Sequence, residues 1–241
     1  MVGPRPSPEQ IEELSALGIQ KVISVDAFPP ESSLWEKSVQ VRHLPLGYRD
    51  LPKTLQLRLA RELATDPVKT YVHCHHGKHR GPAAALAALR TLNQVDQAEA
   101  MVWLDRCGVE YQGLRDAVQD AQPESSDEIQ AAKPLEEVAA TRSLSRLMAE
   151  IDEVWDRLKK VPLPKDPIAI TQKEDASQLV DLFRLSSKSA GPVDPAYPKQ
   201  MRQAIDLATK LEAQLQLGQD AAQMRATLRA SCRACHRAFR D

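Results

Sequence analysis

The chain has 241 residues, and its 32 lysines and arginines almost balance 33 aspartates and glutamates, which gives a net charge of −1. This balance excludes a general nucleic-acid-binding protein, which would need a strongly basic surface. No apolar run approaches the length that crosses a bilayer, and the segment 1–6 lacks the apolar core of a signal peptide, so we expect no transmembrane segment. The length is sufficient for two domains.

The first half of the chain alternates between helical and extended patterns. A capping box at Ser7-Pro8-Glu9-Gln10 begins a predicted helix, which Gly18 ends. The elements predicted after it are strands at 21–25, 39–44 and 70–73, and helices at 53–64, 80–92, 95–107 and 112–120. This order predicts an α/β fold with a small central sheet and flanking helices.

The most informative stretch follows the last predicted strand and reads Tyr71-Val72-His73-Cys74-His75-His76-Gly77-Lys78-His79-Arg80-Gly81-Pro82. A strand, a short loop and a helix N-terminus form an anion-binding arrangement, because the loop N–H groups and the helix dipole aim at one point. Arg80 could bind two oxygens of the same anion, and the positive field would keep Cys74 as the reactive thiolate. The alternative is a buried cysteine at a strand end beside a solvated basic cluster.

The pattern His73-Cys74, five residues, then Arg80 resembles the signature of the cysteine-dependent protein tyrosine and dual-specificity phosphatases. The resemblance implies a phosphatase-like α/β domain over residues 1–120, with Cys74 as nucleophile and Asp50 as general acid. It implies a phosphorylated protein or a small phosphomonoester as substrate. The implied phosphate-binding residues are His75, His76, Gly77, Lys78, His79 and Arg80.

Other residues leave parts of this interpretation open. Asp50 could be only a turn residue, in which case Asp26 is the next candidate for the acid. The position of Asp26 at the end of a buried strand favours instead a structural hydrogen bond to a helix or loop amide. Lys78 resembles a lysine of phosphatases that act on inositol phospholipids, although a solvated lysine is the simpler interpretation.

The sequence also departs from the phosphatase pattern in two ways. Gly81 stands where the family usually has a serine or threonine that stabilises the leaving thiolate, so we expect slow turnover or a loop that only binds phosphate. The family usually begins with a further strand, and only the segment 1–6 remains to supply it. We therefore expect the first strand to be missing.

The second half of the chain has a different pattern. The segment 121–139 has few large apolar residues and predicts a polar linker. Residues 140–241 carry apolar side chains at helical spacing and predict an all-α, four-helix bundle. The first helix of this bundle has an apolar stripe made of Leu144, Leu147, Met148, Ile151, Val154, Trp155 and Leu158.

The last predicted helix contains Cys232-Arg233-Ala234-Cys235-His236, the attachment pattern of a c-type haem. In this interpretation Cys232 and Cys235 form thioethers to the haem, and His236 ligates the iron. A thioredoxin-like redox pair would need a preceding strand, and a zinc site would need a second ligand pair in this half of the chain. Both alternatives are therefore weaker.

A haem motif in the final helix of a four-helix bundle resembles cytochrome c-prime and its low-spin relatives. The resemblance implies a covalently bound haem c, with Met148 as a possible second axial ligand, and a redox partner protein. It also implies export, for example to a bacterial periplasm, because covalent haem attachment takes place there. This localisation is inferred from the motif alone.

Two functions are compatible with these motifs. The first is a cysteine-dependent phosphatase whose haem domain senses redox state or a gas. The second is an electron-transfer or gas-binding cytochrome whose phosphatase-like domain only binds a phosphate or another anion. Gly81 favours the second function, whereas the set Cys74, Arg80 and Asp50 favours the first.

Overall fold

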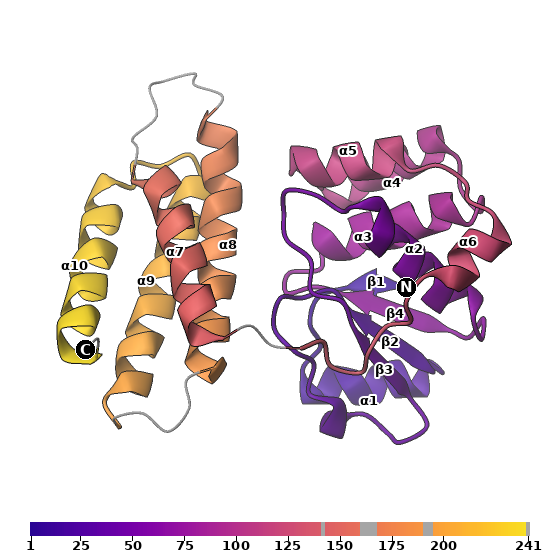
Figure 1. Ribbon diagram of the computed structural model, residues 1–241, viewed down its shortest axis with the longest axis horizontal. Helices are drawn as coiled ribbons and strands as arrows, with labels where there is room; N and C mark the ends of the chain where they lie inside the picture. Colours follow the sequence, from indigo (N-terminus) through magenta and orange to yellow (C-terminus); the bar gives the residue numbers. More distant parts are fainter. Residues whose placement is uncertain (141–142, 160–167, 190–194, 240–241) are drawn as a thin grey trace. The chain divides into compact units, whose positions relative to one another are not determined.

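The computed structural model of the protein describes residues 1–140, 143–159, 168–189 and 195–239 (Figure 1). The chain divides into two compact units, Met1–Ala139 and Ala140–Asp241. Among the described helices, none is both long enough and apolar enough to cross a membrane.

The first unit is an α/β unit in which helices alternate with the strands of one sheet. Its strands are β1 (Val2–Gly3), β2 (Lys21–Ser24), β3 (Gln40–His43) and β4 (Thr70–His73). Its helices are α1 (Pro8–Ala16), the short 3-10 helix η1 (Ser32–Leu34), α2 (Lys53–Ala64), α3 (Arg80–Thr91), α4 (Gln97–Cys107), α5 (Gln112–Asp120) and α6 (Ser126–Ala131).

The sheet is parallel, with the strand order β1-β4-β2-β3. Its register aligns Ser24 with His43 on one side and with His73 on the other. The residues that follow β2, β3 and β4 therefore meet at the carboxyl edge, where parallel α/β sheets place their ligands.

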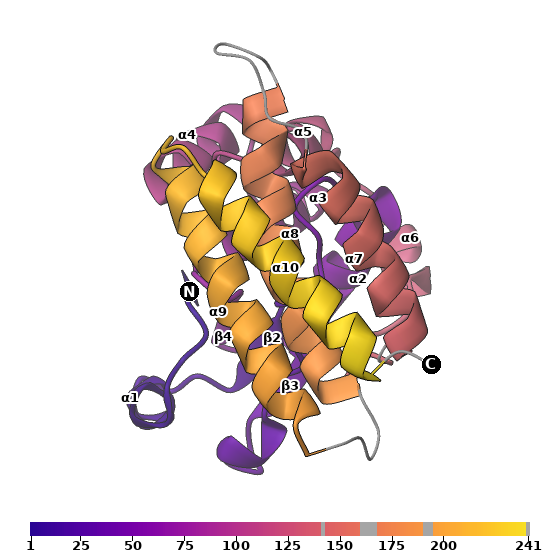
Figure 2. The ribbon, with the colours of Figure 1, turned by 90° about the vertical axis from the view of Figure 1, so that its left-hand side faces the viewer.

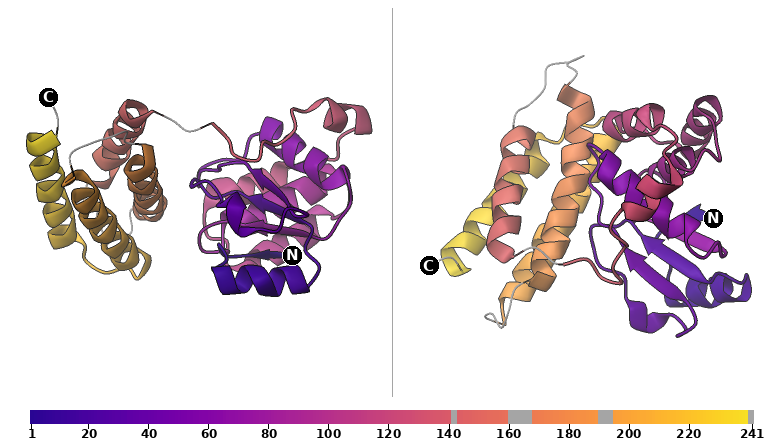
Figure 3. Two further views of the ribbon diagram at one scale, coloured as in Figure 1. Left: turned by 90° about the horizontal axis from the view of Figure 1, so that it is seen from below. Right: turned by 45° about the vertical axis from the view of Figure 1, so that its right-hand side comes forward.

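Each face of the sheet packs against helices because alternate residues of a strand point to opposite sides. Val22, Val41 and Tyr71 pack on one face with Ile11 and Leu14 of α1. On the other face, a larger core brings strand residues together with residues of α2 to α6. Figure 3 shows the ribbons of helices on both sides of the sheet. The expected small sheet with flanking helices is confirmed.

The amino-terminal segment supplies a strand, in contrast to the expectation that the first strand is missing. Val2 and Gly3 pair in parallel with Val72 and His73 of β4. The Tyr71 hydroxyl donates a 2.7 Å hydrogen bond to the Pro4 carbonyl and fixes the next turn of the chain. A strand of two residues is too short to show a period in sequence.

The segment 121–139, expected to be a polar linker, is instead packed onto the first unit. It contains α6, which begins with a capping box formed by Ser125 and Glu128, and it buries Ile129 and Leu135 in the larger core. The backbone N–H of Ala139 donates to the ring atom Nδ1 of His43 at 3.2 Å, and the backbone N–H of His43 donates to the Glu136 carbonyl. Two apolar residues were enough to dock a segment that is otherwise polar.

The second unit consists, in its described part, of α7 (Leu144–Leu158), α8 (Ile168–Ser189), α9 (Tyr197–Gln216) and α10 (Ala222–Phe239). Each helix contacts the next in the chain, and Figure 2 shows α9 and α10 side by side. On α7 the buried residues are Leu147, Ile151, Val154 and Leu158, which recur every three or four positions as the predicted stripe requires. The unit is helical, as expected.

Candidate functional site

The loop between β4 and α3 lies at the carboxyl edge of the sheet, and it begins and ends with buried residues. Cys74, directly after β4, is 2% exposed, and Arg80, the first residue of α3, is 1% exposed. Gly77 has φ +74°, and a Cβ there would lie 2.3 Å from the backbone nitrogen of Pro4. Only glycine can occupy this position, because both the φ angle and the close approach exclude a side chain.

Arg80 is held by three residues from two segments, the end of β2 and the loop between β3 and α2. Its Nη1 donates to the Leu46 carbonyl at 3.2 Å, and its Nη2 lies 3.5 Å from Asp26 Oδ1. The guanidinium carbon lies 4.3 Å from the centre of the Tyr48 ring, a cation–π contact. A buried arginine with these contacts has little rotamer freedom, which preorganises it for binding an anion.

Asp26 is fully buried and links several groups of the site. Besides contacting Arg80, its Oδ2 lies 3.9 Å from His75 Nδ1. Its backbone carbonyl lies 2.9 Å from His43 Nε2. The sequence offered Asp26 as a competing acid or as a structural hydrogen-bond acceptor at a strand end, and it did not predict the contact with Arg80. The sequence signal that could have predicted this contact is the position of Asp26 just after β2, because β2 lies next to β4 in the sheet.

Asp50, the predicted general acid, is exposed in the irregular segment between β3 and α2. This segment passes close to the site, because Leu46 and Tyr48 both contact Arg80. It also packs closely on α5, where the Cα of Gly113 leaves room for the Arg49 carbonyl. The structure thus brings Asp26 into contact with Arg80 and leaves Asp50 at the surface of the neighbouring loop.

The histidines around the loop differ in exposure: His73 is buried, His75 and His79 are half-buried and His76 is exposed. His73 is buried, and desolvation lowers its pKa to about 4. Desolvation, together with the charges of neighbouring basic residues, lowers the pKa of His79 to about 4 as well, and its ring packs edge-on against Tyr111 at 4.6 Å. His76 and Lys78 are exposed at the rim of the loop.

Gly81 leaves a small space beside the sulfur of Cys74. A Cβ built on Gly81 would lie 3.7 Å from Cys74 Sγ and 3.3 Å from Cγ1 of Val2. A serine here would therefore place its hydroxyl within reach of the sulfur, after a small movement of the Val2 side chain.

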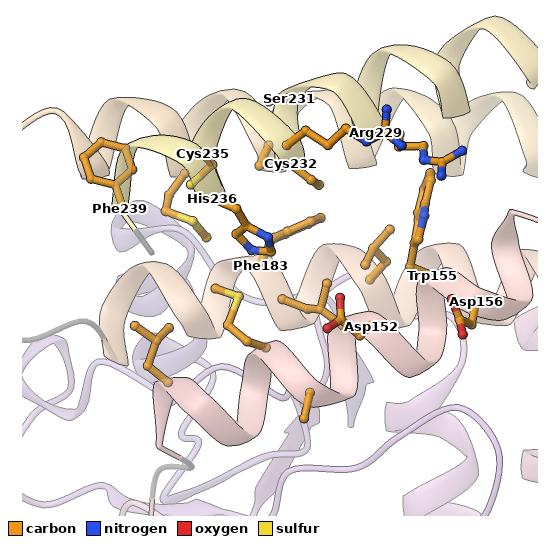
Figure 4. Close-up of a pocket in the computed structure, with 18 of the residues that line it drawn as sticks. Asp152, Trp155, Asp156, Phe183, Arg229, Ser231, Cys232, Cys235, His236 and Phe239 are labelled. Atoms are coloured by element: carbon orange, nitrogen blue, oxygen red, sulfur yellow. The ribbon is translucent and has the colours of Figure 1, made fainter. Parts of the chain in front are cut away.

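The second unit contains a cavity of about 740 Å³, within the size range of small-molecule and cofactor sites. Cys232, Cys235 and His236 of α10 line it, and so do Met148 and Trp155 of α7. Figure 4 shows the His236 ring directed into this space. Both cysteines are free, and burial raises the pKa of the Cys232 thiol to about 11.

These residues fit a c-type haem. Two free thiols one helical turn apart lie beside an imidazole and line a cavity of sufficient size, whose walls are mainly apolar but also carry charged side chains such as Asp152 and Arg229. Met148, predicted as a second axial ligand, lines the same cavity from another helix.

No family model matches the chain, and no curated protein matches it. Among solved structures, a cysteine-to-serine variant of P. aeruginosa TpbA in complex with pTyr is 19% identical. The match covers 49% of this chain and 85% of that chain, with a TM-score of 0.39. Tk-PTP in the active form is 21% identical over 53% of this chain and 84% of that chain, with a TM-score of 0.35. Because both TM-scores are below 0.5, the function proposed below rests on the residues of the site.

Proposed function

We propose that the first unit is a cysteine-dependent phosphomonoester hydrolase of the tyrosine or dual-specificity type. The observation that carries this proposal is the short loop that joins Cys74 to Arg80 at the carboxyl edge of the sheet. Its glycine is fixed in the left-handed conformation, and its arginine is held by Asp26, Leu46 and Tyr48. A phosphoryl group bound there would meet a sulfur nucleophile and a preorganised cation together.

In the first step, the Cys74 thiolate attacks phosphorus, an S–P bond forms and the bond from phosphorus to the leaving oxygen breaks. Arg80 and the loop N–H groups stabilise the charge on the other three oxygens. The leaving oxygen takes a proton from a carboxylic acid, for which Asp50 is the proposed donor. In the second step, water attacks phosphorus and gives a proton to the carboxylate that the first step left at Asp50. The S–P bond breaks, inorganic phosphate leaves and Cys74 returns as thiolate.

Asp26 has a different proposed role. Its carboxylate is fully buried beside the Arg80 guanidinium, so it is suited to hold that cation rather than to reach a leaving group. We infer that Asp26 is a positioning residue. The substrate class is a phosphorylated protein or a small phosphomonoester.

An aryl phosphate assay tests this proposal. Slow hydrolysis is expected from the wild type, and Cys74→Ser and Arg80→Ala should abolish it. Cys107→Ser and Arg106→Ala are matched controls, because both residues lie on α4, outside the loop. Hydrolysis that persists unchanged in Cys74→Ser would exclude the mechanism.

We also propose that the second unit carries a covalently bound haem c, on the basis of the cavity that Cys232, Cys235 and His236 line. Each thiol would add across a vinyl group of the haem, so that sulfur bonds to one carbon and the proton goes to the other. His236 would ligate the iron and Met148 would be its second ligand. When bound, the haem would supply one-electron transfer or, at an open iron position, gas binding.

This haem would make the unit a redox or gas sensor for the phosphatase, or a carrier that exchanges electrons with a redox partner protein. The electron-carrier role would fit a first unit that binds phosphate without hydrolysing a phosphoester. The proposal includes export to a compartment where haem is attached.

Pigment retention is the test of haem attachment. Full-length protein made in a host that attaches c-type haem should be red and should keep its colour through acid–acetone extraction. A Cys232→Ala, Cys235→Ala double variant should lose the pigment, whereas Cys107→Ala should keep it, since Cys107 lies in the first unit. A colourless wild type would refute the proposal.

A further inference from the structure

His43, the last residue of β3, is a buried histidine whose two ring nitrogens both have partners. Nδ1 accepts from the backbone N–H of Ala139 at 3.2 Å, and Nε2 lies 2.9 Å from the backbone carbonyl oxygen of Asp26. A backbone N–H can only donate and a carbonyl oxygen can only accept. Nδ1 must therefore carry the lone pair and Nε2 the proton, so the two contacts together select one tautomer of the neutral ring. Burial favours the same neutral form, because it lowers the pKa of His43.

On one side of this ring, the Nε2 hydrogen bond holds the backbone of Asp26. The carboxylate of the same residue is fully buried, and its Oδ1 lies 3.5 Å from Arg80 Nη2. An aspartate side chain is short and has only two rotatable bonds, so a shift of its backbone moves the carboxylate with it. The place of the Asp26 oxygen beside Arg80 therefore depends on the contact with His43.

On the other side of the ring lies the segment 132–139, which is docked on the first unit by several contacts. Arg58 of α2 donates to two backbone carbonyls of this segment, at 3.0 and 2.9 Å. Leu135 is 6% exposed and belongs to the larger core. Ala139, which donates to His43, is the last residue of the first unit, and the chain continues from it into the second. The segment that leads to the second unit is thus joined to the phosphate site through one histidine.

We propose that His43 is a positioning residue of the phosphate site, and that it makes the docked segment 132–139 a part of that site. The inference rests on the proposed function of the first unit and adds to it a control of anion affinity. His43 holds Asp26 in the position in which its carboxylate restrains Arg80. Without the Ala139 hydrogen bond the ring is free to turn, and Asp26 and Arg80 gain freedom that a bound phosphate must remove, which lowers the affinity. His43 acts through Asp26 and not on the substrate.

Three variants of the full-length protein test this proposal. His43→Leu removes both ring hydrogen bonds, His43→Gln can keep both because its amide has an acceptor and a donor, and Ala139→Pro removes only the N–H that His43 accepts. Arg90→Met is the matched control, because Arg90 is also buried and donates to the Ala121 carbonyl, in the last turn of α3 and away from Arg80. The measurements are the dissociation constant of inorganic phosphate by calorimetry, kcat/KM for an aryl phosphate, and the free energy of unfolding in urea.

His43→Leu and Ala139→Pro should each weaken phosphate binding roughly tenfold and lower kcat/KM by a similar factor, because Arg80 is misplaced. His43→Gln should keep most of the affinity, and Arg90→Met should lose stability without losing affinity. If His43→Leu does not fold, Ala139→Pro makes the comparison with the ring still in place.

Wild-type affinity for phosphate in folded His43→Leu or in Ala139→Pro, or an equal loss of affinity in Arg90→Met, would overturn the inference alone. A wild type that binds phosphate and hydrolyses no aryl phosphate would refute the hydrolase alone, because the phosphate affinities of the variants still support or overturn the role of His43. A wild type that binds no phosphate would overturn both.

Discussion

Asp26 and Asp50 are two carboxylates in different surroundings, since Asp26 is buried against Arg80 and Asp50 is exposed, and we propose different roles for them. Asp50→Asn should slow hydrolysis of substrates with poor leaving groups far more than of those with good ones, because only the former need a proton. Asp26→Asn should lower kcat/KM roughly 10- to 100-fold for both kinds, through misplacement of Arg80. The measurement is kcat/KM against leaving-group pKa. Equal losses for all substrates in Asp50→Asn would transfer the acid role to another residue.

Gly81 is the position at which a single hydroxyl should change the slow step. Because a Cβ here lies 3.7 Å from Cys74 Sγ, Gly81→Ser should stabilise the departing thiolate and speed hydrolysis of the phosphoenzyme. Gly81→Ala is the control, since it adds the Cβ without the hydroxyl. Single-turnover kinetics separate the two steps. Equal rates in the serine and alanine variants would show that the hydroxyl has no such effect.

His73 should make the first unit less stable in mild acid. Its pKa falls from 6.5 in the unfolded chain to about 4 in the fold, so below pH 6.5 the unfolded chain binds more protons. The stabilisation is complete above pH 6.5 and is lost as the pH falls toward 4, by up to about 1.4 kcal/mol per pH unit. Urea unfolding at several pH values measures this slope. His73→Gln should remove its own share of the slope, while His79, whose pKa is lowered to the same value, keeps its share. An unchanged slope would assign the effect to other groups.

At the scale of the elements, Lys21 of β2 joins the sheet to the end of α2. Its side chain is 1% exposed and donates to the Glu62 and Thr65 carbonyls at 2.7 and 2.8 Å. Lys21→Met should lower the free energy of unfolding by roughly 3 kcal/mol, because buried helix-end carbonyls lose their donor. Lys69→Met is the control, since Lys69 donates to the Leu17 carbonyl from the surface. Similar losses in both variants would contradict this account.

The regular elements could be predicted because their patterns are local. The capping box at Ser7, the alternating strand β3 and the stripe of α7 each follow from neighbouring residues. The short β1 and the docked segment around α6 could not, because they depend on partners distant in the chain: Val72 for β1 and His43 for Glu136. The contact between Asp26 and Arg80 was missed for the same reason, since only the sheet order brings them together.

At the scale of the whole molecule, each of the two units carries one candidate site, and each site is concentrated in one short sequence segment. The segment 74–80 lies at the carboxyl edge of a parallel sheet, and the segment 232–236 lies on the wall of a helical cavity. The structural surroundings support the interpretation of each motif in a way that the sequence pattern alone cannot. In the first unit Arg80 is fixed by its neighbours, and in the second unit the motif lines a cavity of cofactor size.

The most direct test of the central claim is to trap the phosphoenzyme. The protein is mixed with an aryl phosphate, denatured within the first turnovers and digested, and its peptides are measured by mass spectrometry. We predict a phosphoryl group on Cys74 in the wild type, more of it than in Gly81→Ser, and none in Cys74→Ser. Hydrolysis of the substrate with no phosphoryl group on Cys74 at any time would contradict the claim that this cysteine is the nucleophile.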